Sequence, residues 1–387
     1  MLSFLKNIKG DRAIWGIVAL LGLFSFLPIY SASGDFIKQI FLLLLGFAII
    51  YGVHKVPTHF FKGLSIIAMP IVIVLLVYTL AQGKTIDGAN ASRWINIPFT
   101  GISFQTSAFA TVILMVYVAR YLAKIKDKTV TFKESILPLW TPVFLVVVLI
   151  LPANLSTAAI IFFMVLVLTF LGGYPVKYLL MMVGTGIAGL ALFILVAKQF
   201  PDAFDNRIDT WESRFVNFFD GKEDAGDYQI ERAKIAIATG DILGKGSGKS
   251  VMKNLLPQSS SDFIYAIIIE EYGLVGGFAL LFFYLLFLFR LVVIANGSPT
   301  VFGKLLAVGV GLPIVFQAFI NMAVAVGLFP VTGQTLPLIS SGGTSLWMTC
   351  LAIGIVLSAS NKDSNDEENV TVDIDETNPL EVLSGQL

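Results

Sequence analysis

The sequence is poor in the side chains on which metalloproteins, disulfide-bonded proteins and most soluble enzymes depend. It contains one cysteine, Cys350, so no disulfide can form within the chain. Besides this cysteine there are only two histidines, His54 and His59, which excludes a zinc site of the usual cysteine and histidine type. Charged residues make up 13% of the chain, about half the ~25% of an ordinary soluble domain. The formal net charge of zero gives no indication of nucleic-acid binding.

Apolar residues are abundant instead, and they occur in long runs. The hydrophobic fraction is 56% and the mean hydropathy is +0.83. Runs of about 20 apolar residues are long enough to cross a bilayer as helices. We therefore predict an all-α membrane protein, a polytopic bundle of ten transmembrane helices, over residues 13–32, 36–53, 60–80, 104–123, 135–151, 155–172, 176–198, 262–293, 300–326 and 340–359.

Lysine and arginine are distributed unevenly over the connections between these spans. With the N-terminus placed inside the cell, fourteen of them lie in inside segments and three in short outside segments. Because basic residues favour the cytoplasmic side, we expect both termini in the cytoplasm. The longest polar stretch, about 199–261, then becomes a large extracytoplasmic loop between helices seven and eight. We expect one membrane domain over residues 1–361, and an acidic, disordered cytoplasmic tail over 362–387.

One segment of the large loop resembles a phosphate-binding loop without meeting its spacing. The stretch from Gly244 to Ser250 reads GKGSGKS, whereas the motif needs a glycine one position earlier, where Leu243 stands. No strand and helix pattern flanks it, and it lies outside the cell's ATP pool, so we exclude ATP binding. Its amides and lysines remain candidates for holding a pyrophosphate group.

The stretch 255–277 carries the acidic residues of most interest. Asp262 follows three serines at the predicted outer start of the eighth helix. A helix N-cap explains this position by spacing alone, and a catalytic carboxylate is the alternative. Glu270 and Glu271 follow two to three turns further into the membrane, about 12 Å along a helix, where ionisable side chains are costly. Glu271 lies opposite Asp262 around the helix, so we expect a structural role for it and expect only Glu270 to support Asp262.

A run of helix-breaking residues interrupts the apolar pattern over 321–347, with Pro330, Gly333, Pro337, Gly342 and Gly343. Irregular backbone at membrane depth is tolerated only where protein buries it or where it lines a cavity. The segment is therefore either part of a site or an ordinary outer turn.

Together these stretches resemble the SEDS family (shape, elongation, division, sporulation) of FtsW/RodA type. The resemblance runs from Asp11 to Ser360 and is carried by the motifs GANASRWI (88–95), NLSTA (154–158), DYQIERAKIAIATGDILGKGSGKS (227–250), SDFIYAIIIEEYGLVG (261–276) and INMAVAVGLFPVTGQTLPLISSGGTSL (320–346). It implies a ten-helix fold with a large outer loop in the bacterial inner membrane. The implied activity is that of a peptidoglycan glycosyltransferase that polymerises lipid II into glycan strands. The implied partners are a class B penicillin-binding protein transpeptidase and other membrane proteins of the division or elongation machinery.

The resemblance also places the family's essential acidic residue at Asp262. Several positions differ from the family pattern: Ala108 stands where relatives often carry glutamate, Thr111 where they carry lysine, Asn154 where they carry aspartate, and Ser341 where they carry tyrosine. Asp262 then has fewer acidic neighbours than usual. This favours a single base over a metal ion held by several carboxylates.

We therefore expect Asp262 to take the proton of an acceptor sugar hydroxyl as it attacks the anomeric carbon of an undecaprenyl-linked glycan donor. The leaving pyrophosphate needs positive charge, and a divalent cation, Mg²⁺ or Mn²⁺, is an open addition. The expected substrate-binding residues are Arg93, Lys245, Lys249, Lys253, Gln229, Ser340, Ser341, Gly342 and Gly343. A septal, FtsW-type role in division is preferred to RodA-type elongation. A lipid II flippase and a non-catalytic scaffold are the alternatives from other functional classes.

Overall fold

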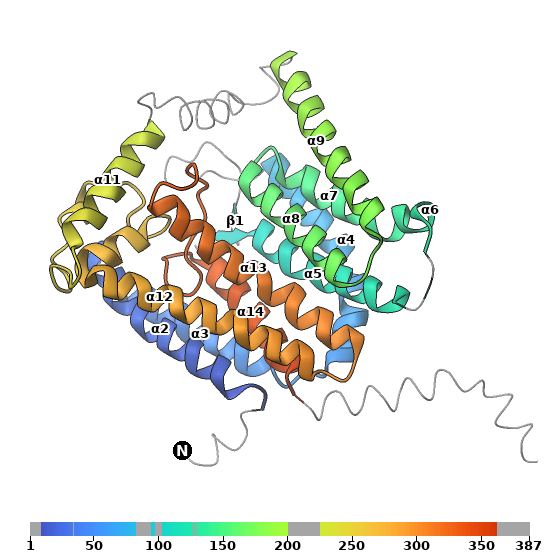
Figure 1. Ribbon diagram of the computed structural model, residues 1–387, viewed down its shortest axis with the longest axis horizontal. Coiled ribbons are helices and arrows are strands. Elements are labelled where there is room, and N and C mark those ends of the chain that lie inside the picture. Colours follow the sequence, from blue (N-terminus) through green and yellow to red (C-terminus); the bar gives the residue numbers. More distant parts are fainter. Residues whose placement is uncertain are drawn as a thin grey trace, which may run out of the picture.

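The computed structural model describes residues 9–33, 35–82, 94–96, 103–126, 128, 130–199 and 225–361 of the 387-residue chain. Within these residues the regular structure is helical apart from one pair of short strands (Figure 1). The α-helices are α2 (Arg12–Ala32), α3 (Phe36–Val53), α4 (Thr58–Gln82), α5 (Thr106–Ile125), α6 (Phe132–Ser135), α7 (Thr141–Ile150), α8 (Leu155–Leu171), α9 (Val176–Gln199), α11 (Ala225–Gly240), α12 (Ile264–Gly297), α13 (Val301–Ala325) and α14 (Thr344–Ala359).

Eight helical segments in the described part of the chain are long and apolar enough to cross a membrane. They are α2, α3, α4, α5, the segment Phe132–Ile150, α9, α12 and α13. Two further apolar helices, α8 and α14, have 17 and 16 residues. Each of the ten predicted spans therefore holds an apolar helix, and the protein is a helical, multi-pass membrane protein; the ten-span topology itself stays a prediction.

Several predicted features lie outside the described residues. They are Arg93, the part of the large loop over 200–224, and the tail over 362–387. The second half of the predicted loop is described, and it forms the helix α11, the turns over 241–251 and the 3-10 helix η3 (Met252–Asn254).

The fifth predicted span is interrupted near its beginning. A π-helix, η1 (Ile136–Trp140), joins α6 to α7 and contains Pro138. Proline has no backbone N–H to donate in a regular α-helix, and here the Thr141 amide bonds to the carbonyl of Ile136, five residues back. The carbonyl of Pro138, four residues before Pro142, which also has no N–H, accepts a hydrogen bond from the Tyr117 hydroxyl of α5 at 2.7 Å.

A small strand pair was not predicted for the outer connection between α4 and α5. Strand β1 (Trp94–Asn96) pairs antiparallel with β2 (Ser103–Gln105), with Ile95 opposite Phe104. The Thr344 hydroxyl at the start of α14 donates to the Ser103 carbonyl at 2.8 Å and accepts from the Gln105 amide at 3.1 Å. These bonds fix the strand pair against the outer end of α14.

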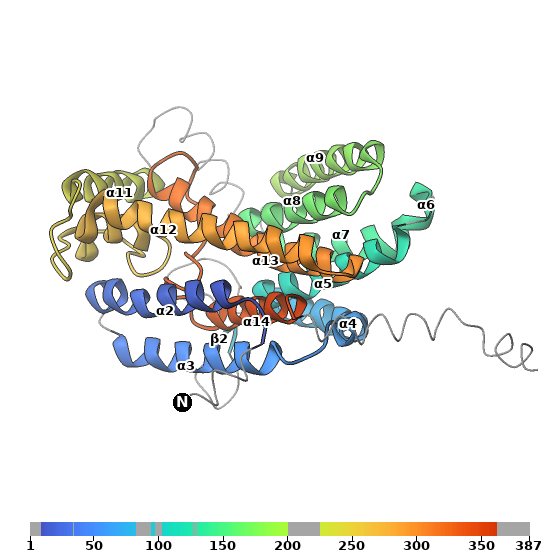
Figure 2. The ribbon, with the colours of Figure 1, turned by 60° about the horizontal axis from the view of Figure 1, so that its bottom comes forward.

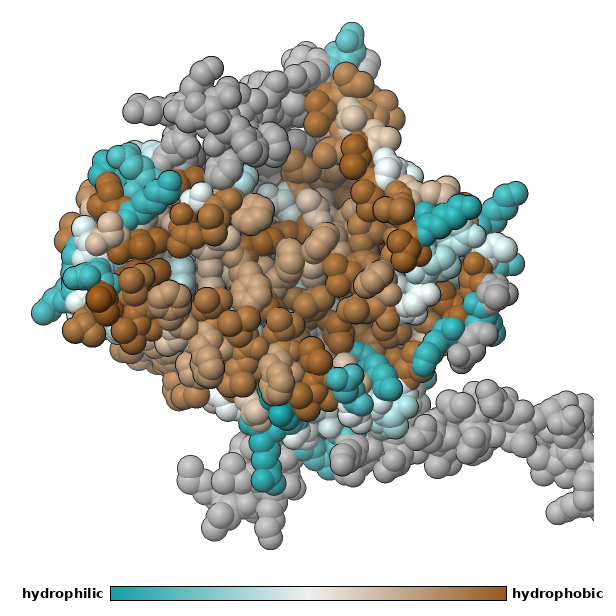
Figure 3. All heavy atoms as spheres, in the orientation of Figure 1, coloured by the Kyte–Doolittle hydropathy of each residue, from teal (hydrophilic) through white to brown (hydrophobic). Residues whose placement is uncertain are grey.

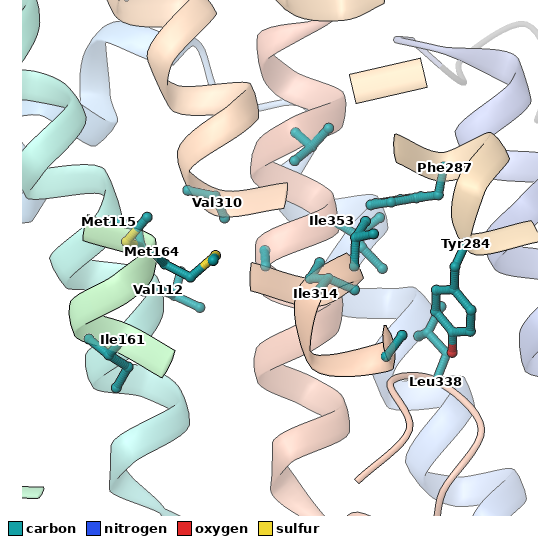
Figure 4. Close-up of a cluster of buried hydrophobic side chains, with 14 of the residues drawn as sticks. Val112, Met115, Ile161, Met164, Tyr284, Phe287, Val310, Ile314, Leu338 and Ile353 are labelled. Atoms are coloured by element: carbon teal, nitrogen blue, oxygen red, sulfur yellow. The ribbon is translucent and has the colours of Figure 1, made fainter. Parts of the chain in front are cut away.

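The core lies between α5, α8, α12, α13 and α14. In Figure 4, Met115 of α5 and Met164 of α8 face Val310 of α13, while Ile353 of α14 lies near Phe287 of α12. Figure 2 shows α2 and α14 between α3 on one side and the pair α12 and α13 on the other. Helix α9 stands apart from this core, since only 11% of its span is buried. The apolar surface in Figure 3 is the one expected to face lipid.

Candidate active site

The site is built on a break in α12. Gly273 has φ 69° and ψ −172°, so the helix stops there and restarts. The Tyr265 hydroxyl donates to the carbonyl of Gly277 at 3.2 Å. In one straight helix these residues would be about 18 Å apart along the axis. Residues 264–272 therefore fold back along the beginning of the segment 274–297.

This fold-back corrects two expectations. The predicted span 262–293 is not a single long helix, although residues 274–297 alone suffice to cross a bilayer. Glu270 is eight residues after Asp262, which lies in the turn before α12, but it does not lie below Asp262 on one straight helix. It lies beside the fold at Gly273, against the loop that follows α11. The predicted course of the chain, from Asp262 straight down into the membrane to Glu270, was wrong because the chain reverses at Gly273.

The loop after α11 supplies the hydrogen bonds that the broken helix loses. The amides of Lys245 and Gly246 donate to the carbonyls of Glu270 and Glu271, at 3.0 and 2.9 Å. The amide of Leu274 donates to the carbonyl of Asp241 at 2.9 Å. Such groups are costly to leave unpaired inside a protein.

Close contact between the loop and the fold requires glycine. A Cβ on Gly273 would lie 2.1 Å from the Ile242 carbonyl oxygen, and one on Gly244 would lie 2.2 Å from that of Glu271. Both residues also have φ in the left-handed region.

Glu270 closes this loop. Its side chain is 0% exposed and pairs with Lys245 Nζ at 2.7 Å. It also accepts from the Ser250 hydroxyl and from the amides of Val251 and Met252, at 3.1 and 3.2 Å. Four donors on one buried carboxylate compensate for its desolvation. The hydrogen bond from the Met252 amide to the Glu270 carboxylate thus joins the two ends of the segment 252–270, which contains Asp262.

Glu271 is the neighbouring buried carboxylate, at 1% exposure. It accepts from the Ser31 hydroxyl of α2 and from the Ser250 amide, the latter at 3.2 Å. Its contacts join α2 to the loop. The arrangement agrees with the structural role predicted for it.

The segment Gly244–Ser250 that resembles a phosphate-binding loop therefore holds the protein's own carboxylates. The amide of Ser250 and its hydroxyl both donate to glutamate side chains. Of the lysines there, Lys245 pairs with Glu270, and Lys253 donates to the Gly248 carbonyl at 3.0 Å and to the Ser31 hydroxyl at 3.4 Å. Lys249 is exposed.

Asp262 lies in the turn that precedes α12 and is half-buried. The N-cap of α12 is Phe263, without a side-chain hydrogen bond, so Asp262 lies one residue before the cap position. The turn is fixed from three directions. Ser340 donates its hydroxyl to the Ser261 carbonyl at 2.6 Å, and the Ser341 amide donates to the Ser260 carbonyl at 2.9 Å. The Ser259 hydroxyl donates to the Lys253 carbonyl at 2.9 Å.

Asn321 of α13 fixes the turn from the third direction, and it was not among the residues predicted from the sequence. Its side chain is 1% exposed and donates to the carbonyls of Asp262 and Gln334, both at 2.7 Å. Gln334 in turn donates to the Thr157 hydroxyl at 2.8 Å. The signal that could have revealed Asn321 is the pair of side-chain amides, Gln317 and Asn321, in the apolar run over 301–325.

The structure thus brings together two segments that are about 80 residues apart in sequence. The helix-breaking segment after α13 packs against the Asp262 turn, so it is part of this site rather than an ordinary outer turn. Ser340 and Ser341 reach the turn by hydrogen bonds, and Gly342 and Gly343 follow them directly. Gln229 lies half-buried on α11. Asn154 accepts from the Thr157 amide and caps α8.

Comparison with known proteins identifies the chain at the level of its family. A family model described as a cell cycle protein, FtsW/RodA/SpoVE, matches residues 11–365. The chain belongs to the FtsW/RodA/SpoVE family. The resemblance predicted from the motifs is confirmed.

Relatives of this family match most of the chain. The probable peptidoglycan glycosyltransferase FtsW of Saccharophagus degradans is 32% identical over 367 residues, covering 89% of this chain and 91% of the relative. The FtsW of Nitrosococcus halophilus, which has the same description, is 30% identical over 324 residues, covering 83% and 81%. The stage V sporulation protein E of Bacillus subtilis is 28% identical over 369 residues, covering 92% and 98%.

Solved structures of the FtsW/RodA/SpoVE family agree with the fold. One, described as structural coordination of polymerization and crosslinking by a peptidoglycan synthase complex, matches with a TM-score of 0.72 and 27% identity, covering 92% of this chain and 98% of the other. The rod shape determining protein RodA of Thermus thermophilus matches with a TM-score of 0.64 and 26% identity, covering 91% and 96%.

Proposed function

We propose that this protein is a peptidoglycan glycosyltransferase that polymerises lipid II on the outer face of the bacterial inner membrane. It crosses the membrane ten times, with both termini in the cytoplasm. Its role is septal wall synthesis in division, which the FtsW relatives favour over elongation. Its partner is a class B penicillin-binding protein transpeptidase, in keeping with the similarity to a peptidoglycan synthase complex.

The observation that carries the proposal is the position of Asp262. Its side chain is half-buried, on a turn fixed by Ser340, Ser341 and Asn321. A base that must meet a sugar hydroxyl needs a fixed position within hydrogen-bond reach of it. A turn held at three backbone carbonyls, those of Ser260, Ser261 and Asp262, meets this need better than a mobile loop.

The reaction follows from this position. A hydroxyl oxygen of the acceptor sugar forms a bond to the anomeric carbon of the lipid-linked donor, and the bond from that carbon to the pyrophosphate oxygen breaks. The Asp262 carboxylate accepts the hydroxyl proton. Undecaprenyl pyrophosphate leaves with the bonding electron pair. One direct displacement inverts the configuration at the anomeric carbon.

The lysines of the loop provide positive charge near the departing pyrophosphate, and they differ in their roles. Lys249 is exposed and is our first candidate for contact with the pyrophosphate. Lys245 and Lys253 serve to hold the loop, because Glu270, Ser31 and Gly248 already occupy them. Arg93 is kept as a candidate from the sequence alone.

A divalent cation would take its ligands mainly from the substrate. Among the described residues no three histidine, cysteine or acidic side chains lie close enough to hold a metal ion. Mg²⁺ is often held by one or two carboxylates together with substrate phosphates, and Asp262 with the pyrophosphate oxygens fits that pattern. When bound, such an ion would neutralise negative charge on the leaving group.

The test is polymerisation by the purified full-length protein in detergent with labelled lipid II. Asp262→Asn should reduce the rate by about 10²–10⁴-fold, the usual contribution of a general base. Ser261→Ala is the matched control, since the Ser340 bond reaches the Ser261 backbone and not its side chain. Polymer formed at an undiminished rate by Asp262→Asn would refute the proposal. If the wild-type protein makes no polymer but moves labelled lipid II across vesicles, the flippase is correct instead.

A further inference from the structure

Six cationic side chains gather at the end of the bundle opposite Asp262. They come from three parts of the chain: the last turns of α5 and the connection after it, α6, and the first turn of α9. We call this surface the basic interface, and it consists of Arg120, Lys124, Lys126, Lys128, Lys133 and Lys177. All are exposed except Arg120, which is half-buried.

Specific contacts hold these three parts together. Gly172 in the turn before α9 lies so close to α5 that a Cβ there would be 2.8 Å from Leu122 Cδ1. The rings of Phe132 and Tyr178 join α6 to α9, with centroids 5.3 Å apart. In addition, the Trp140 indole donates to the Tyr174 hydroxyl at 3.2 Å. The cations are therefore presented by a fixed framework.

Negative charge is scarce around this surface. Between residues 103 and 199 the sequence has only two acidic residues, Asp127 and Glu134. The carboxylate of Glu134 accepts from the Thr131 amide at 2.9 Å and completes a capping box at the start of α6. Six cations against two acids give the region an excess of positive charge that its own residues do not neutralise.

Apolar side chains are exposed directly beside the cations. In η1, Ile136 and Leu137 are 42% and 76% exposed, and in α9, Val176 and Leu180 are 53% and 67% exposed. Figure 3 shows hydrophilic side chains over α6 adjoining hydrophobic ones. A surface that exposes both kinds of side chain side by side suits the boundary between lipid tails and headgroups.

We propose that the basic interface binds the phosphate groups of anionic lipids in the adjacent leaflet. Lysines next to a membrane span are attracted to anionic headgroups, and the exposed Leu137 and Leu180 place this surface at the level of the lipids. A site for soluble phosphate would not need the exposed apolar side chains that lie beside the cations. The general excess of basic residues on one side of a membrane does not explain why six gather around three converging segments.

The same end of the bundle provides matched cations that are spread apart. Lys55 lies over the Tyr51 ring at 3.8 Å, and Lys62 lies over the Phe302 ring at 5.1 Å. Lys304 is exposed near the start of α13. These three lysines carry the same charge but do not belong to the basic interface.

The experiment compares two triple variants of the full-length protein in nanodiscs of phosphatidylglycerol and phosphatidylcholine. One is K124Q/K133Q/K177Q and the other is K55Q/K62Q/K304Q. Selectivity for phosphatidylglycerol is measured with spin-labelled lipids. We expect the first variant to lose selectivity about tenfold or more and the second to lose less than about twofold. Raising the salt concentration should weaken the wild-type selectivity towards the level of the first variant.

Two results would overturn the proposal. Equal losses in both variants would mean that only overall charge matters. Wild-type selectivity abolished by millimolar inorganic phosphate would mean that the surface is a site for soluble anions. Equal midpoints of thermal unfolding for the variants exclude misfolding as the cause, and the double variant K124Q/K177Q replaces the first triple if that one fails to fold.

Discussion

Asn321 shows how one polar residue fixes the backbone that carries the candidate base. It lies in the apolar helix α13 and is buried, and both hydrogens of its amide group are donated to carbonyls of other segments. One of these carbonyls belongs to Asp262 itself. The side chain thus links the turn before α12 to the irregular segment after α13.

At this scale we predict the effect of Asn321→Leu. Two partly buried carbonyls lose their donor, which should cost about 1–3 kcal/mol of stability. The polymerisation rate should fall further than stability explains, because the Asp262 turn is released on one side. Thermal unfolding and the lipid II assay on the same preparation separate the two effects.

Gln317→Leu is the control for Asn321, because Gln317 lies one turn earlier on α13 and donates only to Thr335. It should lose stability without a selective loss of rate. If both variants lose activity in proportion to stability, Asn321 has only a structural role.

The fold-back at Gly273 and the loop after α11 form one structural unit. The loop takes over the hydrogen bonds that the helix gives up, and Glu270 and Lys245 close it. Because the chain between Met252 and Glu270 is closed by these bonds, the position of Asp262 depends on residues eight and ten positions away in the sequence as well as on its immediate neighbours.

At the scale of this element we predict different outcomes for two lysines. Lys245→Met leaves the buried Glu270 without its cation, at a cost of about 1–3 kcal/mol given that the Lys245 side chain is 30% exposed. Lys249→Met removes an exposed side chain and should leave stability unchanged. If Lys249 contacts the pyrophosphate, its variant should raise KM for lipid II.

Unfolding midpoints and KM values for both lysine variants give the measurement. A stable Lys245→Met protein with raised KM would reverse the assignment, placing Lys245 at the substrate.

Polar contacts at two opposite ends of the molecule hold its helices together. At the end away from Asp262, Asp11 caps α2 through the Ile14 amide at 2.9 Å and forms an ion pair with Arg290 of α12. The Asp11 amide also donates to the Ser360 hydroxyl after α14, at 2.9 Å. Three helices that are distant in sequence therefore meet at one residue.

We predict that Arg290→Met affects the molecule as a whole and leaves the chemistry unchanged. Loss of the pair with Asp11, which is 7% exposed, should lower stability by about 1–3 kcal/mol. The polymerisation rate measured well below the unfolding midpoint should stay within twofold of the wild type. Lys304→Met, an exposed cation at the same end, is the control and should change neither quantity. A selective loss of rate in Arg290→Met would instead indicate coupling between the two ends.

The sequence by itself determined the class of protein, its family and the approximate ranges of most apolar helices. These properties follow from composition, from run length and from motifs, all of which are local. The course of helix α12 could not be predicted from local sequence. Its apolar run reads as one span, yet the fold-back at Gly273 places Glu270 against the loop.

Only the tertiary structure decided which polar groups meet. The amides of the loop could have bound a phosphate, but they bind Glu270 and Glu271. The side chain of Asn321 binds the carbonyl of Asp262, in a turn 59 residues away in the sequence. A buried donor must find an acceptor somewhere in the fold, and which acceptor it finds depends on how distant segments pack together.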